Sequence, residues 1–319
     1  MNRFAKYAWG VLAYNIAVVV WGAYVRASKA GAGCGEHWPD CNGQVIPLAG
    51  NAKTLIEFTH RATSGLAGFA VLILMVWAFR AFPKKHSVRT AAVISFIFII
   101  IEGLIGAVLV KKGLVADNDS IARAVVISIH LVNTLLLLAV LAVTAWWATS
   151  QQAVGIPLFW YQNFKTAVIL LVCILAVLAL SATGAVTALG NTLFPINSMA
   201  EGIARDLSPT HILQSLIWIH PVAAVVIGLS LTFVLVLLGY SQKSPVALKL
   251  ANLQIGFVVI QMIFGGVNLL LHAPVWMQLL HLFMADLVWV NLILFAVTLL
   301  AQDQIEALAS DKESVLVTI

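Results

Sequence analysis

The sequence predicts an all-α integral membrane protein of about eight transmembrane helices, arranged as two tandem, pseudo-symmetric four-helix bundles. Of its 319 residues, 61% are hydrophobic and only 10% are Asp, Glu, Lys or Arg. Soluble domains are about 45–50% apolar and about 25% charged, so this chain lacks the polar residues to cover a water-facing surface. The composition excludes a soluble enzyme, a disordered protein and a nucleic-acid-binding protein.

The predicted helices follow from the lengths of the apolar segments. A helix that crosses a bilayer needs about 20 consecutive, mostly apolar residues. The segments that meet this criterion are 8–27, 55–79, 89–110, 121–147, 165–188, 211–239, 248–270 and 275–301. Residues 302–319 are polar and acidic, and we expect them to form a short cytoplasmic tail.

The loop charges predict the orientation. The short loop between the second and third segments is strongly basic. Its charges are Arg80, Lys84, Lys85 and Arg89. Cytoplasmic loops carry an excess of Lys and Arg, so we expect a protein of the cell membrane with both termini in the cytoplasm. The loop that carries Cys34 and Cys41 then lies outside, where a disulfide can persist.

The two halves of the chain resemble each other. Residues 21–25 and 183–187 share a central Gly-Ala pair, while 102–108 and 261–267 share a polar first residue and a glycine at the fifth position. Every even-numbered segment carries one histidine. These observations predict a parallel repeat of a four-helix unit, with one bundle over 1–150 and the other over 151–301.

The four histidines in the even-numbered segments are His60, His130, His220 and His281. Ionisable residues inside a membrane are expensive and are functional candidates by default, although a single buried histidine can simply bond a carbonyl. Two histidines at matched depth in one four-helix bundle can supply both axial ligands of a haem iron. We therefore predict two haem sites, one with His60 and His130 and the other with His220 and His281. No cluster has the short ligand spacing of a structural zinc site.

Glu57 precedes His60 by three residues, on the same face of its helix. Its carboxylate is expected to point into the first haem pocket, although an acid near a helix start is also favoured by the helix dipole. The second half has Leu216 or Ile217 at the corresponding place. This asymmetry indicates that one pocket performs chemistry while the other holds a cofactor.

Other polar residues are candidates for supporting roles. Glu102 aligns with Gln261 in the other half and either lines a proton path or hydrogen-bonds across helices. Asp286 is a further acid within an apolar segment. Arg26 and Arg61 are expected either to pair with haem propionates or to extend toward the membrane interface.

The order of motifs in the first half resembles the haem A synthase family. The matching residues are Gly22 to Arg26, then Gly33-Cys34, Trp38 to Gly43, and Glu57 to Arg61. The eight-helix duplicated layout and the histidine positions match as well. The resemblance covers nearly the whole chain, and the cysteine loop followed by Glu-x-x-His-Arg is its most specific part.

The resemblance implies an enzyme that oxidises a ring methyl group of haem O to a formyl group by successive hydroxylations. The product is haem A for terminal oxidases. By resemblance, His60 and His130 bind haem O and haem A, whereas His220 and His281 bind a haem B cofactor. Glu57 acts at the reacting methyl group, by stabilising a cationic intermediate or by positioning an oxygen donor.

The resemblance also implies partners and a role for the cysteines. The partners are the haem O synthase that supplies the substrate, an electron donor or acceptor, and the lipid bilayer, with no nucleic acid. Cys34 and Cys41 form a disulfide that is structural or transfers electrons. The sequence departs from the fullest family pattern because the loop after the fifth segment has no cysteine pair, and Thr187-Ala188 stands where a Val-Arg pair occurs.

Three other functions fit the sequence less well. A two-haem, quinol-linked cytochrome that carries electrons often has two histidines on one helix, whereas each even-numbered segment of this chain has one. That function also leaves Glu57 unexplained. A transporter is expected to have helices broken at mid-membrane, and none is evident. A haem farnesyltransferase needs aspartate-rich motifs for magnesium diphosphate, and the sequence has none.

Overall fold

The computed structural model describes residues 1–48, 50–150, 164–240 and 244–317, with side chains up to residue 301 except at 150. Within these ranges the chain is helical and contains no strand, only an isolated bridge between Cys41 and Gln44. Eight helices are long and apolar enough to cross a membrane. This confirms the prediction of an all-α, multi-pass membrane protein.

The membrane-spanning helices begin and end within a few residues of the predicted limits, except at the chain termini and at the end of the fifth. They are α1 (Arg3–Ala27), α2 (Ala52–Ala81), α3 (Ser87–Lys111), α4 (Ile121–Ser150), α5 (Phe164–Leu193), α7 continued by α8 (Ile212–Leu216 and Ile219–Tyr240), α9 (Pro245–Leu270) and α10 (Val275–Val317). Side-chain caps explain several starts: Asn2, Asn51 and Ser244 each accept a backbone N–H of the first turn. The backbone of α10 continues over the segment predicted as a polar tail, whose side chains lie outside the described part.

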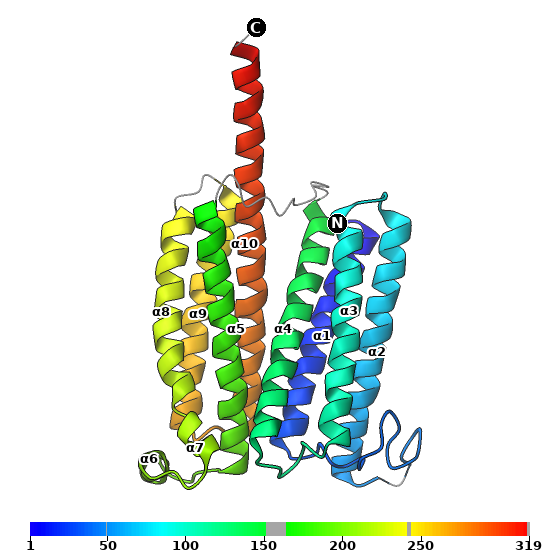
Figure 1. Cartoon of the computed structure of the whole chain (residues 1–319), viewed down its shortest axis with the longest axis vertical. Coiled ribbons are helices and arrows are strands. Elements are labelled where there is room, and N and C mark those ends of the chain that lie inside the picture. Colours follow the sequence, from blue (N-terminus) through cyan, green and yellow to red (C-terminus); the bar gives the residue numbers. More distant parts are fainter. Residues whose placement is uncertain (49, 151–163, 241–243, 318–319) are drawn as a thin grey trace.

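One short helix was not predicted. It is α6 (Met199–Leu207), which lies between α5 and α7 at the end of the molecule opposite the two termini (Figure 1). Ser198 caps it by accepting the backbone N–H of Glu201. It is too short to cross a bilayer. In the sequence, its two ends are marked only by the residues of the flanking loops.

The helices pack as two groups of four. Helices α1 to α4 contact one another, and α5, α8, α9 and α10 form a second group, with α7 against α5 (Figure 1). The groups meet where α1 and α4 face α5 and α10. At this interface the indole of Trp289 donates a hydrogen bond of 2.6 Å to the carbonyl of Leu135. The larger of two clusters of buried apolar side chains among the described residues extends through both groups.

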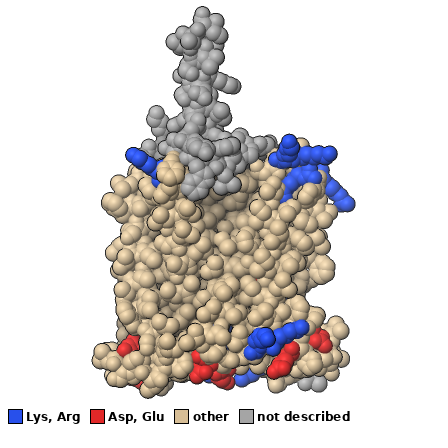
Figure 2. Space-filling view, in the orientation of Figure 1, with Lys and Arg blue, Asp and Glu red and all other residues tan. Residues whose placement is uncertain are grey.

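The surface shows the pattern of a protein in a bilayer. In Figure 2 the middle of the molecule is almost free of charged side chains, which gather at its two ends. Large apolar side chains such as Phe69 and Leu104 are exposed on this middle band. Both termini lie at one end, and the loop that carries Cys34 and Cys41 lies at the other (Figure 1).

Candidate functional site

The four intramembrane histidines lie at one level. Each is near the start of its helix, at His60 in α2, His130 in α4, His220 in α8 and His281 in α10. These helices all begin at the end of the molecule that carries the cysteine loop and α6 (Figure 1). The structure therefore gathers the predicted histidines in one layer, two in each group of helices.

The second-half histidines face each other closely. The ring centres of His220 and His281 are 6.3 Å apart, and the ring planes are almost perpendicular, at 89°. Nδ1 of His220 lies 3.2 Å from both the Thr183 hydroxyl and the Leu180 carbonyl. An Nδ1–H donated to a carbonyl orients the ring and leaves Nε2 with a free lone pair.

The first-half histidines have a more polar setting. Nε2 of His130 lies 3.1 Å from a carboxylate oxygen of Glu102, on α3. The same carboxylate accepts hydrogen bonds from the Asn133 amide, at 2.5 Å, and from the Thr134 hydroxyl. His60 is near enough to His130 to interact with it electrostatically, and its Nδ1 is buried with no hydrogen-bond partner among the described residues.

A glycine of the preceding helix supports the first histidine of each half. A Cβ on Gly22 would lie 2.9 Å from Cε1 of His60, and a Cβ on Gly184 would lie 2.9 Å from Cε1 of His220. Only glycine lets the backbone approach the imidazole this closely. These two glycines occupy equivalent places in the sequence repeat, so the repeat preserves the packing as well as the histidines.

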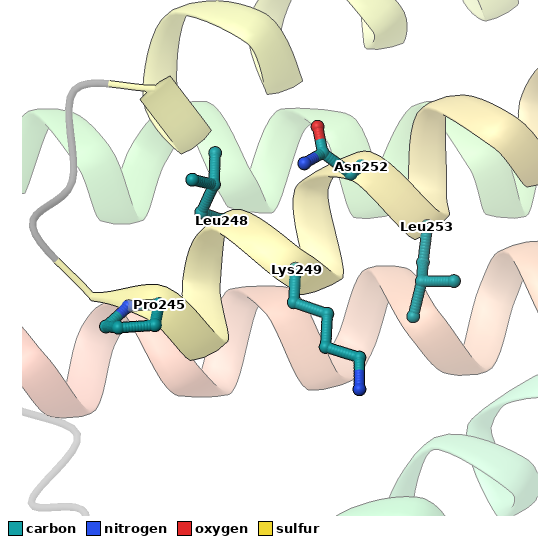
Figure 3. Close-up of a pocket in the computed structure, with 5 residues that line it drawn as sticks. All are labelled: Pro245, Leu248, Lys249, Asn252 and Leu253. Carbon is teal, nitrogen blue, oxygen red and sulfur yellow. The ribbon is translucent and has the colours of Figure 1, made fainter.

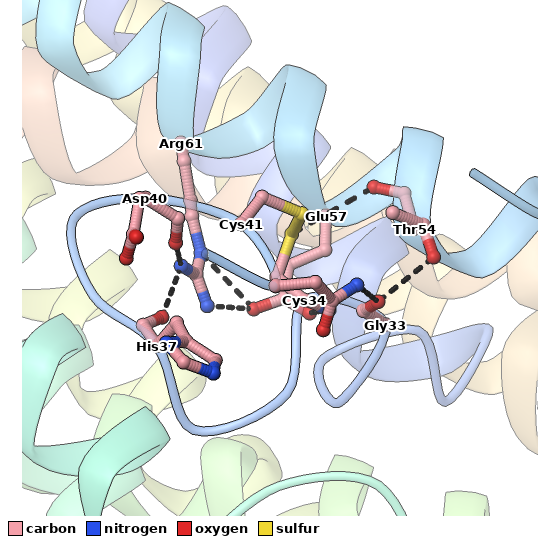
Figure 4. A network of polar contacts seen from close by, with 9 residues as sticks. Gly33, Cys34, His37, Asp40, Cys41, Thr54, Glu57 and Arg61 are labelled. Atoms are coloured by element: carbon pink, nitrogen blue, oxygen red, sulfur yellow. Dashed lines mark hydrogen bonds and ion pairs between the residues drawn. A yellow bond between two sulfur atoms is a disulfide. The ribbon is translucent and has the colours of Figure 1, made fainter. Parts of the chain in front are cut away.

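The cysteine loop is fastened to the start of α2. Cys34 and Cys41 form a disulfide with 4.4 Å between their Cα atoms, as the resemblance implied. The backbone N–H of Cys34 donates to Oε2 of Glu57 at 2.8 Å, and the Thr54 hydroxyl donates to the carbonyl of Gly33 at 2.8 Å (Figure 4). Both cysteines are buried, so the loop packs as a cover on this end of the first half.

Glu57 and Arg61 form a buried ion pair within this network. The Arg61 guanidinium contacts Oε1 of Glu57 at 2.5 and 3.1 Å, and it also donates to the backbone carbonyls of His37 and Asp40 (Figure 4). The Glu57 side chain is only 4% exposed. The carboxylate one turn before His60 is thus held in place by two groups, the Arg61 guanidinium and the backbone N–H of Cys34. All the Arg61 contacts in the described structure are to Glu57 and the cysteine loop.

Arg26 links the two halves. From the end of α1, it donates to the Ala188 carbonyl at 2.6 Å and to the Thr192 hydroxyl at 2.7 Å on α5, and to Gln278 of α10 at 3.0 Å. Ala188 stands at the repeat position equivalent to Arg26 itself. Among the described residues these partners are all neutral, so the guanidinium keeps its charge available to an anion.

Four buried polar residues escaped the sequence reasoning or were left without a role. Arg123 is 2% exposed and donates to the carbonyls of Ala116 and Asn118. Asn133 and Thr134 follow His130 by three and four residues, a helical spacing that signals one shared face. Asp286 is fully buried on α10, and neither of its oxygens has a partner among the described residues.

The second histidine pair fits an iron bound through two imidazoles. A metal about 2 Å from a nitrogen of each of two imidazoles places the ring centres roughly 6 Å apart, which matches the 6.3 Å between His220 and His281. Nδ1 of His60 and Nδ1 of His281 are also buried, and neither has a hydrogen-bond partner among the described residues. No group of three or more His, Cys, Asp or Glu side chains among those residues could hold a bare metal ion. The donor set therefore suits a haem better than an isolated metal.

A surface hollow lies away from the four histidines. It is formed by the first turns of α9 (Figure 3), which begins at the end of the molecule opposite the histidine layer. Its lining residues are Pro245, Leu248, Lys249, Asn252 and Leu253. None of the predicted site residues belongs to it.

Known proteins similar to this chain include a farnesyltransferase and several heme A synthases. A protein of Thermus thermophilus named protoheme IX farnesyltransferase is 48% identical over 300 residues, which are 94% of this chain and 49% of that protein. The heme A synthases of Geobacillus kaustophilus and Bacillus mycoides are 47% and 36% identical over 96 and 114 residues, or 30% and 35% of this chain and 30% and 37% of theirs. The chain thus spans about half the length of the first relatives, and shorter segments match the heme A synthases.

A family model covers far more of the sequence than the heme A synthase alignments. The COX15-CtaA model, described as cytochrome oxidase assembly protein, matches residues 5–293 and so includes all four histidines, Glu57 and the cysteine loop. With this match over nearly the whole chain, the protein belongs to the COX15-CtaA family of cytochrome oxidase assembly proteins.

Proposed function

We propose that this protein is a haem A synthase, a membrane oxidoreductase that converts a ring methyl group of haem O to a formyl group by successive hydroxylations. The observation that carries the proposal is the pair of histidine sites built on one plan, with carboxylates beside the first and neutral residues beside the second. Family membership and the names of the heme A synthase relatives support it.

The asymmetry supports an assignment of the two sites. The site of His60 and His130 binds haem O and haem A, because the carboxylates of Glu57 and Glu102 lie on its side of the molecule. The site of His220 and His281 holds haem B as the resident cofactor. When bound there, haem B would supply a redox centre.

Glu57 is the residue we propose to act at the reacting methyl group. A fixed negative charge stabilises positive charge that develops at a nearby carbon, and it does so best when it is held in place beforehand. Arg61 and the backbone N–H of Cys34 provide that restraint here. Arg26 is the better candidate to bind a haem propionate, because the contacts of Arg61 all go to Glu57 and the loop.

The partners follow from the substrate. Haem O comes from a haem O synthase, that is, a protoheme IX farnesyltransferase, and the Thermus relative carries that name. This chain has no aspartate-rich motif for magnesium diphosphate, so we do not assign it the farnesyl transfer. The hydroxylations also require an oxygen donor and an electron partner from outside the chain.

We further propose that the protein resides in the cell membrane with both termini in the cytoplasm. The basic loop between α2 and α3 lies at the same end as the termini, which supports this orientation (Figure 2). The disulfide loop then faces the oxidising side. After reduction, a membrane-impermeant thiol reagent is expected to label Cys34 and Cys41 on intact cells, and labelling only of inverted vesicles would contradict the orientation.

The decisive experiment is haem analysis. The full chain is purified in detergent from cells that also make haem O, and the extracted haems are identified by chromatography and mass. Haem B together with haem O, haem A or a hydroxylated form is expected. Haem B alone, in cells rich in haem O, would overturn the proposal in favour of an electron-carrying cytochrome.

Glu57→Gln tests the catalytic assignment. We expect both haems to be retained and conversion of haem O to fall by about 100-fold, the size typical for loss of one fixed electrostatic group. Glu36→Gln removes an exposed carboxylate of the same loop and serves as the matched control. Normal conversion by the Glu57 variant would move the catalytic role to another residue.

A further inference from the structure

The short helix α6 turns its large apolar side chains away from the protein. Met199, Ile203 and Leu207 are four residues apart, so they lie on one face of the helix. Ile203 is 60% exposed and Leu207 is 79% exposed. A helix at a water-facing surface packs its apolar face on the core and exposes its polar face. Because α6 does the opposite, its outward face is suited to an apolar environment outside the chain.

An arginine on the other face of α6 binds the preceding segment. The Arg205 guanidinium donates a hydrogen bond of 3.1 Å to the backbone carbonyl of Phe194, just after α5. Arg205 is two residues from both Ile203 and Leu207, which places it about 200° around the helix axis from each of them. Its side chain is only 11% exposed. The contact therefore fixes a rotation of α6 in which the apolar face points outward.

Two further contacts hold α6 in the same rotation. The Glu201 carboxylate accepts the backbone N–H of Asn197 at 2.8 Å. Gly202 is buried, and a Cβ at this position would lie 2.8 Å from Cδ1 of Ile196. The polar and glycine positions thus face the segment that connects α5 to α6. The outward position of the apolar residues is a consequence of this packing.

The apolar face of α6 continues the surface that meets the lipid. The helix contacts α7, which leads into α8, and it lies at the edge of the second group of helices (Figure 1). Val222, Val226 and Leu229 are exposed on α8, and Trp218 is exposed just before its first residue. Tryptophan is enriched where a membrane meets water. Trp218 therefore places α6 at the level where the bilayer ends.

We propose that α6 lies in the plane of the bilayer interface and anchors this end of the second half, with Met199, Ile203 and Leu207 inserted between phospholipid acyl chains. Interfacial amphipathic helices bury their apolar face by about 5–10 Å at the boundary of headgroups and acyl chains. With nine residues, α6 is too short to cross the bilayer. The occupant is phospholipid because the face is continuous with the lipid-facing surface of α8. The proposal goes beyond the haem chemistry and does not depend on it.

Spin labels on α6 test the proposal. In a Cys173→Ser background, the disulfide leaves no other free thiol. Met199→Cys, Ile203→Cys and Leu207→Cys are labelled one at a time with a nitroxide. Each full-length protein is reconstituted sparsely into vesicles of phosphatidylcholine and phosphatidylglycerol. Collisions of the label with oxygen, which concentrates in the bilayer, are compared with those of a water-soluble nickel chelate. At all three positions we expect oxygen to collide severalfold more often than nickel.

Glu201→Cys labels the polar side of the same helix and is the matched control, at which we expect nickel to collide more often than oxygen. Nickel collisions that predominate at all three apolar positions would overturn the proposal, because the face would then lie in water. Exclusion of both reagents, with dipolar broadening that disappears on dilution by unlabelled protein, would overturn it in favour of a second copy on this face. The three positions are read independently, so the test does not depend on the folding of any one variant.

Discussion

The two histidine sites share their packing and differ in their charges. In each half, a glycine of the first helix lies against the histidine of the second, and a polar residue of the third contacts the histidine of the fourth. Around this shared frame the first half has Glu57 and Glu102, whereas the second has Ile217 and Gln261 at the equivalent positions. The comparison shows that a duplicated bundle can keep the packing of its histidines while the side chains beside them diverge in charge.

The loops at the same end differ in a similar way. The first half closes with a disulfide loop fastened to Glu57, Arg61 and Thr54 (Figure 4). The second half closes with α6, on which Met199, Ile203 and Leu207 are exposed. Within the described part of the chain, the cysteine loop bonds the charged side chains of Glu57 and Arg61, whereas the loop after α6 bonds the neutral side chain of Gln214.

The largest expected effect comes from removing the ligands of one site at a time. His220→Ala or His281→Ala should abolish binding of haem B, while His60→Ala should spare it and abolish binding of haem O, because each haem needs its own axial pair. Haem bound per protein is measured by absorbance after purification. His37→Ala, in an exposed loop position, is the control. Unchanged haem content in both second-half variants would refute the ligand assignment.

The glycine contacts allow a milder test of the same comparison. Gly22→Ala places a methyl group against His60, and Gly184→Ala does so against His220, at 2.9 Å in both cases. Each ring must shift, and overpacking of this kind costs about 1–3 kcal/mol, or roughly tenfold or more in haem affinity at that site.

Titration with each haem measures these affinities, and Gly65→Ala is the control because a Cβ there meets nothing within 4 Å. An equal loss of affinity at both sites in either variant would show that the halves are not independent.

Removing the disulfide should weaken the first half alone. The bond closes a short loop with a sequence separation of 7, so Cys34→Ser with Cys41→Ser is expected to lower the free energy of unfolding by about 2–3 kcal/mol. Thermal unfolding in detergent measures the change, and Cys173→Ser is the matched control for loss of a thiol. Loss of haem B in the double variant would mean that the loop also supports the second half.

The smallest effect concerns a surface ion pair next to the first half. The Lys29 ammonium, 2.6 Å from the Asp117 carboxylate, holds the pKa of that carboxyl below its ordinary value of 3.8. Because the folded-state pKa is lowered, the pair contributes stability above pH 3.8, and this is lost as the pH falls through the folded pKa.

Lys29→Ala should therefore lower the Tm slightly at about pH 7. It should leave the Tm unchanged at a pH below the folded-state pKa of Asp117. Melting curves at both pH values measure this, and Lys84→Ala, at an exposed lysine outside this ion pair, is the control. An equal Tm difference at both pH values would show that the contribution is not electrostatic.

The sequence by itself determined the number of membrane spans, their approximate limits and the level of the four histidines. Backbone groups in lipid must be bonded within a helix, so length and hydropathy are sufficient to find the spans. The sequence also paired Cys34 with Cys41, which the disulfide confirms, and the catalytic role of Glu57 stays a prediction. Short polar segments carry no such constraint, which is why α6 was missed.

Only the tertiary structure decided which side chains meet. Arg26 and Arg61 are similar in sequence, yet Arg26 reaches across to α5 and α10 whereas Arg61 is held by the cysteine loop. The contact of Glu102 with His130 likewise depends on how α3 and α4 rotate against each other. Hydropathy determines that a helix crosses the membrane. It does not determine the rotation of that helix or which helices it contacts, because these depend on packing between residues far apart in the chain.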